Sequence, residues 1–421
     1  MSEGVLFDAS RLVSRSERSS PTGVDRVCLA YAEWLLARPD LNMIPVRSKH
    51  DRLVAVDEVW FRACVKSLRA RWTGQDLDSA MVARGHRLFE ALKAGRPGAE
   101  SVISIPPPAT RPDMAGARRL RVWKQFFRSR KMPELPASRH YFNVGHTSLN
   151  TPDILSSLSD RGIQSVVLLH DLIPITHPEF CRPGDGDKHR LRVLTALQYA
   201  SRIIVNSHYT AAQLAEFAER EGVAAPPIDA VHLGLEPVFM IRPGTATPRP
   251  YFVHVGTIEA RKNLAFLLTI WRRLQERMGE ATPQLVLVGR YGWENEAVLD
   301  HLQRSPNLRG LVHQSANLPD ASLAMLMNNA QAVLAPSSVE GFDLPAVEAC
   351  ALGVPLIASD IPAHRELVPR AELIDPLDGL GWLAALERAT RQRPPAPAYD
   401  PPTWNQHFHQ VAQRVGLTLT S

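Results

Sequence analysis

PSSVEGFDLPAVEAC, residues 336–350, carries two glutamates, Glu340 and Glu348, with seven residues between them. The apolar run 332–335 before it predicts a strand, and Pro345 is a favourable first residue for a helix. A strand, a tight turn and a helix start suit an anion, because free backbone N–H groups and the helix dipole point the same way. In a simpler interpretation, Glu348 only favours the helix dipole and Glu340 is a solvated loop acid.

The spacing of the two glutamates does not stand alone. It is flanked by G-F-D-L-P and followed by A-L-G-V-P-L-I-A, residues 351–358. Together these segments resemble the signature of the retaining glycosyltransferases of family 4. The resemblance implies an α/β fold of the GT-B type, with two Rossmann-like domains facing across a cleft.

Length and composition agree with such an enzyme. The 421 residues exceed one ordinary core, and 45% hydrophobic with 22% charged residues is typical of a soluble globular protein. There is no transmembrane-length apolar run and no signal-peptide pattern, and the four cysteines are far apart, so we expect a reducing, cytoplasmic location. A net charge of +5 favours anionic partners such as nucleotides, diphosphates or acidic lipid. Nothing resembles a nucleic-acid-binding module.

Short β-rich runs alternate with helical patterns, which is typical of βα units around parallel sheets. The expected strands are Val5–Ala9, Met43–Val46, Leu53–Val56, Ser101–Ile105, Tyr141–Val144, Ser165–Leu169, Arg202–Val205, Ala230–Leu233, Tyr251–Val255, Gln284–Val288, Gly310–His313, Ala332–Ala335, Pro355–Ala358 and Ala371–Ile374. A proline-rich segment, 236–250, predicts a linker. We therefore expect an acceptor domain at 1–235, a donor domain at 236–402 and a terminal helix at 403–421, which the resemblance implies crosses back to the first domain.

The segment GTIEARKN follows the first strand of the second half and is expected to open a helix with its basic pair. Gly256 permits a tight turn near a ligand, and Arg261 and Lys262 stand where a diphosphate would lie. The resemblance implies that both bind the leaving diphosphate. Thr257 stands where many members have arginine, so one phosphate contact is missing or supplied elsewhere. A basic first turn on a solvated helix is the alternative. In the first half, Gly23 before a helix would let the donor phosphates approach, although a simple loop-to-helix turn explains it equally well.

Polar residues also follow two strands of the first half. His170 and Asp171 come directly after the apolar run 165–169, at the end where ligands bind in open α/β sheets. The resemblance gives His170 a place beside the transferred sugar; a satisfied buried histidine is the alternative. Asn143 and His146 lie at the end of the preceding strand. We expect them, with Asp171, to contact the acceptor.

The resemblance also implies the mechanism. Glu340 would contact the transferred sugar, and Glu348 the ribose. The backbone N–H groups that assist Glu340 would be those of Gly341, Phe342, Asp343 and Leu344. The leaving phosphate would take the acceptor proton, giving front-face substitution with retention.

No metal ion or cofactor is expected in this mechanism. No D-x-D motif stands at a strand end, since Asp185-Gly186-Asp187 is expected in a polar loop, and no His/Cys/Asp group has metal-ligand spacing. Arg261, Lys262 and the helix dipole would offset the charge on the leaving phosphate instead.

Residues 118–131, RRLRVWKQFFRSRK, are basic and aromatic without an acid. They resemble a helix that lies on an anionic membrane surface. A helix that packs its aromatic side chains on the first domain is the second interpretation, and both stay open.

These features predict a retaining, metal-independent hexosyltransferase that uses a nucleotide-diphosphate sugar. The T-I-E-A-R-K-N variant with Ser359-Asp360-Ile361-Pro362 is similar to mannosyl- and rhamnosyltransferases, so GDP-mannose is the favoured donor. The expected acceptor is a lipid-linked glycan or oligosaccharide in bacterial exopolysaccharide or lipopolysaccharide assembly, on the inner face of the plasma membrane. Two alternatives remain: a nucleotide-sugar epimerase on the same architecture, and a catalytically silent nucleotide-sugar-binding subunit.

Overall fold

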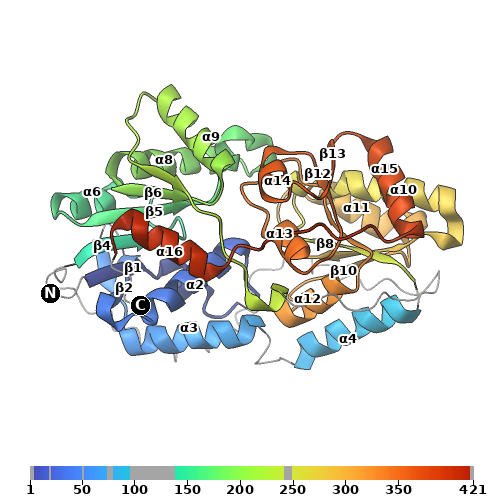
Figure 1. Cartoon of the computed structure of the whole chain (residues 1–421), viewed down its shortest axis with the longest axis horizontal. Coiled ribbons are helices and arrows are strands. Elements are labelled where there is room, and N and C mark those ends of the chain that lie inside the picture. The colour runs from blue at the N-terminus through green and yellow to red at the C-terminus, as the bar shows by residue number, and fades with distance from the viewer. Residues whose placement is uncertain are drawn as a thin grey trace.

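Two separate sheets organise the chain, one in each half, and helices flank both (Figure 1). The computed structural model describes residues 4–18, 20–49, 52–73, 79–94, 138–240 and 249–417. Over these residues the first sheet has seven strands in the order β3-β2-β1-β4-β5-β6-β7, parallel except for the antiparallel edge strand β3. Its strands are β1 Gly4–Asp8, β2 Met43–Lys49, β3 Arg52–Ala55, β4 Ser138–Asn143, β5 Gln164–Leu169, β6 Arg202–Val205 and β7 Ile228–Ala230.

The second sheet has six strands within the described ranges, in the order β10-β9-β8-β11-β12-β13, and all are parallel. They are β8 Tyr251–Val255, β9 Gln284–Val288, β10 Val312–Ser315, β11 Ala332–Ala335, β12 Leu356–Ser359 and β13 Glu372–Ile374. In each half the first strand lies between the second and the fourth. The two sheets therefore share the Rossmann order, in which ligands bind where the strand order reverses.

Helices bury the faces of both sheets, so that every residue of strands such as β1, β9 and β11 is buried and most of these residues are apolar. The first half contains α1 Ser10–Arg15, α2 Gly23–Leu36, α3 Glu58–Thr73, α4 Ser79–Ala94, α6 Pro152–Asp160, α7 Ile173–Thr176, α8 Asp185–Tyr199 and α9 His208–Arg220. The second half contains α10 Leu264–Met278, α11 Glu296–Arg304, α12 Asp320–Asn328, α13 Leu344–Ala351, α14 Pro362–Leu367 and α15 Gly379–Arg391. The apolar stripe of α10 is buried, as its 3.6-residue period requires.

The last described helix, α16 (Trp404–Val415), lies over the first domain although it follows the second in sequence (Figure 1). Its Phe408 ring stacks on Trp34 of α2 with centroids 4.6 Å apart. The Tyr31 hydroxyl lies 2.9 Å from Nε2 of His407, a buried contact between the same two helices. The predicted α/β fold, with two Rossmann-like domains and a terminal helix that crosses back, is confirmed.

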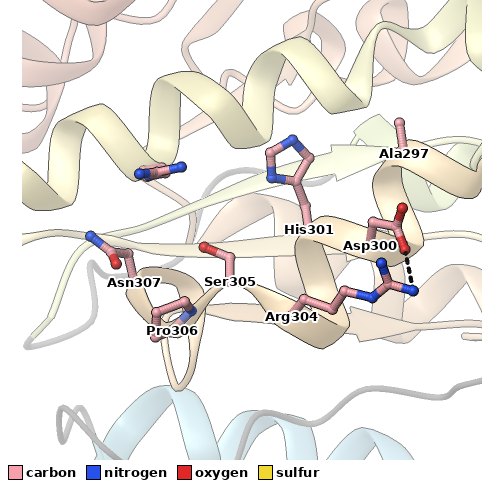
Figure 2. Close-up of a pocket in the computed structure, with 8 residues that line it drawn as sticks. Ala297, Asp300, His301, Arg304, Ser305, Pro306 and Asn307 are labelled. Atoms are coloured by element: carbon pink, nitrogen blue, oxygen red, sulfur yellow. Dashed lines mark ion pairs between the residues drawn. The ribbon is translucent and has the colours of Figure 1, made fainter.

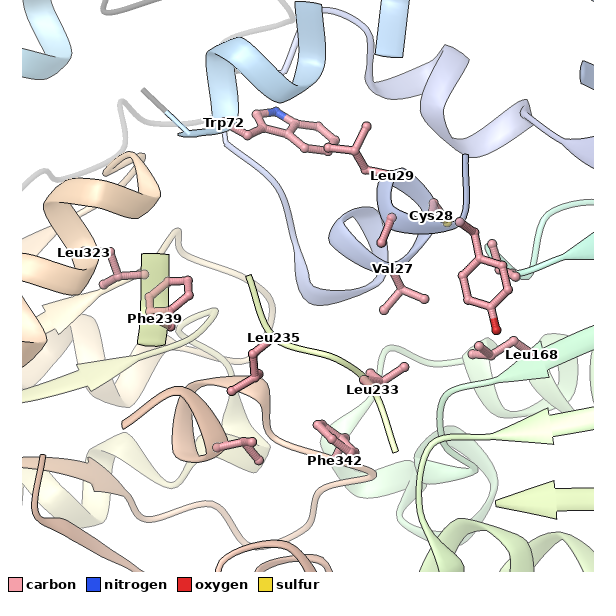
Figure 3. Packing of buried hydrophobic residues seen from close by; sticks show 14 of the residues in the cluster. Val27, Cys28, Leu29, Trp72, Leu168, Leu233, Leu235, Phe239, Leu323 and Phe342 are labelled. Atoms are coloured by element: carbon pink, nitrogen blue, oxygen red, sulfur yellow. The ribbon is translucent and has the colours of Figure 1, made fainter. Parts of the chain in front are cut away.

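Apolar side chains from both halves meet in one cluster, which Figure 3 shows. Val27 of α2 packs there with Leu233 and Leu235 from the segment after β7, and with Phe239 and Phe342. Because this cluster is continuous, the contact between the domains is partly a hydrophobic core. It positions the turn that carries Phe342 against the first domain.

Three local expectations differ from the structure. Arg261 and Lys262 do not open a helix: they lie in a 3₁₀ turn, η4 (Ala260–Lys262), because Asn263 adopts a left-handed conformation with φ 54° and α10 starts only after it. Asp185-Gly186-Asp187 is the first turn of α8 and not a loop; acidic residues favour a helix N-terminus. Strand β7 ends at Ala230, where a strand to Leu233 was expected.

Several expected features lie outside the described residues. These are the strand 101–105, the basic aromatic segment 118–131, most of the linker at 241–248, and the end of the chain after residue 417.

Candidate functional site

The signature residues gather at the edge of the second sheet where its strand order reverses. Strands β8 and β11 are neighbours there, and each is followed by one of the two predicted loops. The backbone N–H of Ser338 donates to the carbonyl of Arg261 over 2.8 Å, which ties the loop after β11 to the turn after β8. The structure thus brings together the two segments singled out by their residue pattern.

Two cations and three carboxylates form a buried ionic cluster in these loops. Lys262 Nζ lies 2.5 Å from Glu340 Oε1 and 3.3 Å from Asp343 Oδ1. Arg261 contacts the other oxygen of Glu340 at 2.5 Å and also pairs with Glu259. Lys262 is 4% exposed and Glu340 5% exposed, so each charge depends on its partners.

The cluster stays ionised at neutral pH. Burial raises the pKa of Glu340, but the charges of Arg261 and Lys262 outweigh it and hold that pKa below its usual range. Burial lowers the pKa of Lys262, and the carboxylates of Asp343 and Glu340 more than reverse this. Both side chains therefore carry charge where a ligand would arrive.

Three consecutive backbone donors complete the cluster. Among the described residues, the N–H groups of Gly341, Phe342 and Asp343 have no hydrogen-bond acceptor. They lie in the turn before α13, whose first N–H groups add to the same positive end. Lys262, Arg261 and these amides together can bind a doubly charged anion such as a diphosphate.

Asp343 is held in a strained backbone conformation, with φ 63°. Its carbonyl accepts from the N–H groups of Ala346 and Val347, and its carboxylate contacts His364 Nε2 at 3.0 Å. The other ring nitrogen of His364 lies 2.8 Å from the Ser359 carbonyl. These two contacts fix the imidazole. Burial lowers the pKa of His364, but the hydrogen bond with Asp343 outweighs burial, so the pKa is raised. His364 is a site residue that the sequence analysis missed.

Glu348 faces the first domain. Arg26 of α2 reaches across with Nη1 2.7 Å from Glu348 Oε1, and its Nη2 pairs with Asp320 of α12. Glu348 Oε2 is buried without a hydrogen-bond partner. Burial raises the pKa of Glu348 to about 7, although Arg26 opposes the shift. The orphaned oxygen is available to a hydroxyl donor, and Arg26 was not anticipated from sequence.

Glycine is required where the turn before α13, which carries Gly341, Phe342 and Asp343 and is called the signature turn below, meets the first domain. A Cβ on Gly341 would lie 2.4 Å from the carbonyl oxygen of His170 and 2.9 Å from Cβ of Asp171, closer than atoms approach. The Gly341 carbonyl accepts from Ser207 Oγ over 2.8 Å. Gly23 adjoins the same turn, since a Cβ there would contact Leu344 at 3.5 Å.

His170, expected beside the transferred sugar, is buried, and His146, expected to contact the acceptor, lies half-buried beside it. His170 and His146 have ring centroids 4.9 Å apart, and His170 Nε2 lies 2.9 Å from the Val144 carbonyl. Burial lowers the pKa of His170 to about 4, so the ring is neutral at pH 7. Asn143 is fully buried, with its amide 2.5 Å from the Thr147 carbonyl and within reach of Asp8. In this arrangement Asn143 supports the loop that carries His146.

Thr257 and Gly256 lie beside the loop after β9. The Ile258 N–H donates to the Arg290 carbonyl over 2.8 Å, and a Cβ on Gly289 would overlap the Gly256 carbonyl at 1.7 Å. Arg290 Nη2 reaches the first domain at the Ser20 carbonyl, 2.9 Å away. The Arg290 backbone thus lies beside the turn that carries Thr257, while its guanidinium extends to the first domain.

A hollow of about 510 Å³ lies elsewhere in the second domain, beside α11, and Figure 2 shows its lining. His301 and Arg304 of α11 line it with Asn307, and the Arg304–Asp300 ion pair on its rim is exposed. None of the sequence-predicted site residues lines it.

Arg26→Met tests the contact with Glu348. We expect it to lower the free energy of unfolding at pH 8 by roughly 3–5 kcal/mol, because Glu348 and Asp320 lose their shared buried cation. The loss should be smaller at pH 6. The pKa of Glu348 in the folded protein, about 7, exceeds its ordinary 4.5, so below pH 7 the folded state holds Glu348 neutral and needs Arg26 less.

Urea unfolding at both pH values measures this difference. The matched control is Arg62→Met, which breaks an exposed pair with Glu58 within one helix, where such pairs contribute about 0.3–0.5 kcal/mol. Equal destabilisation by Arg26→Met at pH 6 and pH 8 would contradict the assignment of Glu348 as its titrating partner.

Known proteins share both the second domain and the fold. The family model described as "Glycosyl transferases group 1" matches residues 239–384. The serotype-specific mannosyltransferase WbdA of Escherichia coli is 28% identical over 230 residues, which cover 51% of this chain and 28% of WbdA. The O-antigen chain mannosyltransferase B of Escherichia coli is 34% identical over 129 residues, 30% of this chain and 33% of that protein. The chain thus spans a third or less of these two relatives.

The solved structures that are similar show the architecture. Anabaena HepE, solved with UDP and glucose, matches with a TM-score of 0.62 at 14% identity, covering 99% of this chain and 100% of HepE. An α,α-trehalose 6-phosphate synthase from Burkholderia multivorans matches with a TM-score of 0.54 at 13% identity, over 99% and 95% of the two chains. Residues 239–384 therefore belong to the group 1 glycosyl transferases, within a chain that has the two-domain GT-B fold.

Proposed function

We propose that this protein transfers a sugar from a nucleotide-diphosphate donor to a glycan acceptor, with retention of configuration. The observation that carries the proposal is the buried cluster of Arg261, Lys262, Glu340 and Asp343 beside free amides at the start of α13. A diphosphate would take Lys262 and Arg261 as partners and release the Glu340 carboxylate to the transferred sugar.

The remaining roles follow from this arrangement. The orphaned Oε2 of Glu348 would accept from the ribose. His170, neutral and adjoining the signature turn, would border the sugar from the first domain. A phosphate oxygen of the leaving group would take the proton from the acceptor hydroxyl. That hydroxyl would attack from the face that the nucleotide leaves, which gives retention. Arg261, Lys262, Arg290 and the free amides would stabilise the departing charge.

Mannose is the proposed sugar and GDP-mannose the proposed donor. The curated relatives named above are mannosyltransferases, and the likeness to WbdA covers half of this chain. O-antigen assembly suggests a lipid-linked glycan as acceptor, at the cytoplasmic face of the membrane. No helix in the described part of the chain is long and apolar enough to cross a bilayer. Neither an epimerase nor a silent binding subunit has a supporting observation of its own.

Thermal unfolding with GDP, UDP, dTDP or ADP, each with a chelator, tests the donor class. We expect GDP to raise the unfolding temperature most, because a ligand at about 100 times its dissociation constant adds roughly 2.7 kcal/mol. Chelation should not remove the effect, since the cations of the cluster replace a metal ion. Stabilisation by another nucleotide alone would refute GDP-mannose as donor, and loss of stabilisation under chelation would refute metal independence.

A further inference from the structure

Two histidines and a glutamate far apart in sequence meet at the contact between the domains. His208 is the first residue of α9, His232 follows β7, and Glu366 lies in α14. One ligand atom from each lies within 4.8 Å of the others. His232 Nε2 is 2.8 Å from Glu366 Oε1.

The chemistry of these three groups suits a divalent transition metal ion. Two imidazoles and one carboxylate, with a fourth position for water, are a ligand set that zinc takes in proteins. The exposed His208 gives an ion access from solvent. A small movement of His208 and His232 would bring all three donors to one ion.

The carboxylate is already oriented by backbone donors. Glu366 Oε1 accepts from the N–H of His208 over 2.8 Å, and Oε2 accepts from the N–H of Tyr209 over 2.9 Å. Each carboxylate oxygen has two lone pairs, so an ion can take the place of the contact between Oε1 and His232 Nε2 while Oε1 keeps the N–H of His208. Hydrogen bonds of this kind fix the ligands of metal sites and raise affinity.

The three groups lie next to the signature turn and come from both domains. The His232 ring is 6.1 Å from that of Phe342. Ser207, the neighbour of His208, donates to the carbonyl of Gly341. We propose that His208, His232 and Glu366 bind one divalent ion of the zinc class. The ion would link the first domain to α14 beside the turn that carries Gly341 and Phe342. The ion would stabilise the closed arrangement and take no part in the transfer step.

The same three side chains without an ion would form only a hydrogen-bonded contact, and a zinc titration separates the two cases. Calorimetry of the full chain, stripped with chelator, should give one Zn²⁺ per chain. Co²⁺ should give the visible absorption of a tetrahedral site. His208→Gln and Glu366→Gln should each weaken Zn²⁺ binding by at least about 10-fold.

The matched control is His409→Gln, which removes another exposed histidine, on α16. It should leave Zn²⁺ binding unchanged. Small-angle scattering should show a smaller radius of gyration with Zn²⁺, and this change should be lost in His208→Gln. Absence of binding, or binding reduced equally by His409→Gln, would overturn the site. The donor site is unaffected by that outcome, because nucleotide stabilisation is measured under chelation.

Discussion

Replacing Glu340 with glutamine should lower the turnover number of sugar transfer by about 10²–10³-fold, the loss typical when one group that stabilises transition-state charge is removed. Affinity for the free nucleotide diphosphate should not fall. Lys262 and Arg261 both pair with Glu340, so removing its charge leaves Lys262 with Asp343 alone and Arg261 with Glu259 alone as carboxylate partners, and both cations become easier for a diphosphate to engage. The variant should therefore bind nucleotide at least as tightly while it transfers sugar far more slowly.

Steady-state kinetics and calorimetry with the nucleotide diphosphate measure the two effects separately. The matched control is Glu372→Gln, which removes an acid of the second domain that pairs with Arg388 at the surface. It should change neither quantity. Unchanged turnover in Glu340→Gln would refute the role of Glu340 at the transferred sugar.

Lys262→Met should weaken nucleotide binding and stability together. Lys262 is the shared cation of Glu340 and Asp343, and breaking a buried pair of this kind costs roughly 3–5 kcal/mol of unfolding free energy. Nucleotide affinity should fall at least about 30-fold, which corresponds to the roughly 2 kcal/mol lost when one partner of a buried charge pair is truncated.

Lys262→Arg keeps the positive charge, so it should recover part of the lost nucleotide affinity and part of the lost unfolding free energy. This variant replaces Lys262→Met in the test if the methionine variant does not fold. Lys188→Met is the control for removing a lysine, because Lys188 is exposed on α8 and pairs only weakly with Asp185, at 3.8 Å. Undiminished nucleotide affinity in folded Lys262→Met would contradict the assignment of the diphosphate to this cluster.

Much of this site could be predicted from local sequence. Alternating apolar runs and helical periods specify parallel α/β domains, and loops after such strands gather at one edge of each sheet. That is why Glu340 and Lys262, 78 residues apart, could be expected near each other. Their direct ion pair could not, because a residue pattern carries no distances.

The contacts between the domains were not predictable in the same way. Arg26 and Glu348 are 322 residues apart, and His232 and Glu366 are 134 apart. The local sequence around Arg26 or Glu366 predicts a helix, but it does not predict which residue of the other domain will contact that helix. His364 was missed for the same reason: its partner Asp343 is 21 residues away, and no residue pattern joins the two.

The most direct test of the central claim is proton NMR of GDP-mannose incubated with the full chain, a chelator and a lipid extract containing candidate acceptors. The account predicts consumption of the donor and a new α-linked mannose signal, both absent with Glu340→Gln. Conversion to a different nucleotide sugar without acceptor would identify an epimerase. If the protein binds nucleotide but consumes neither GDP-mannose nor any UDP-, dTDP- or ADP-sugar, it is a silent binding subunit. Either outcome would contradict transfer at this site.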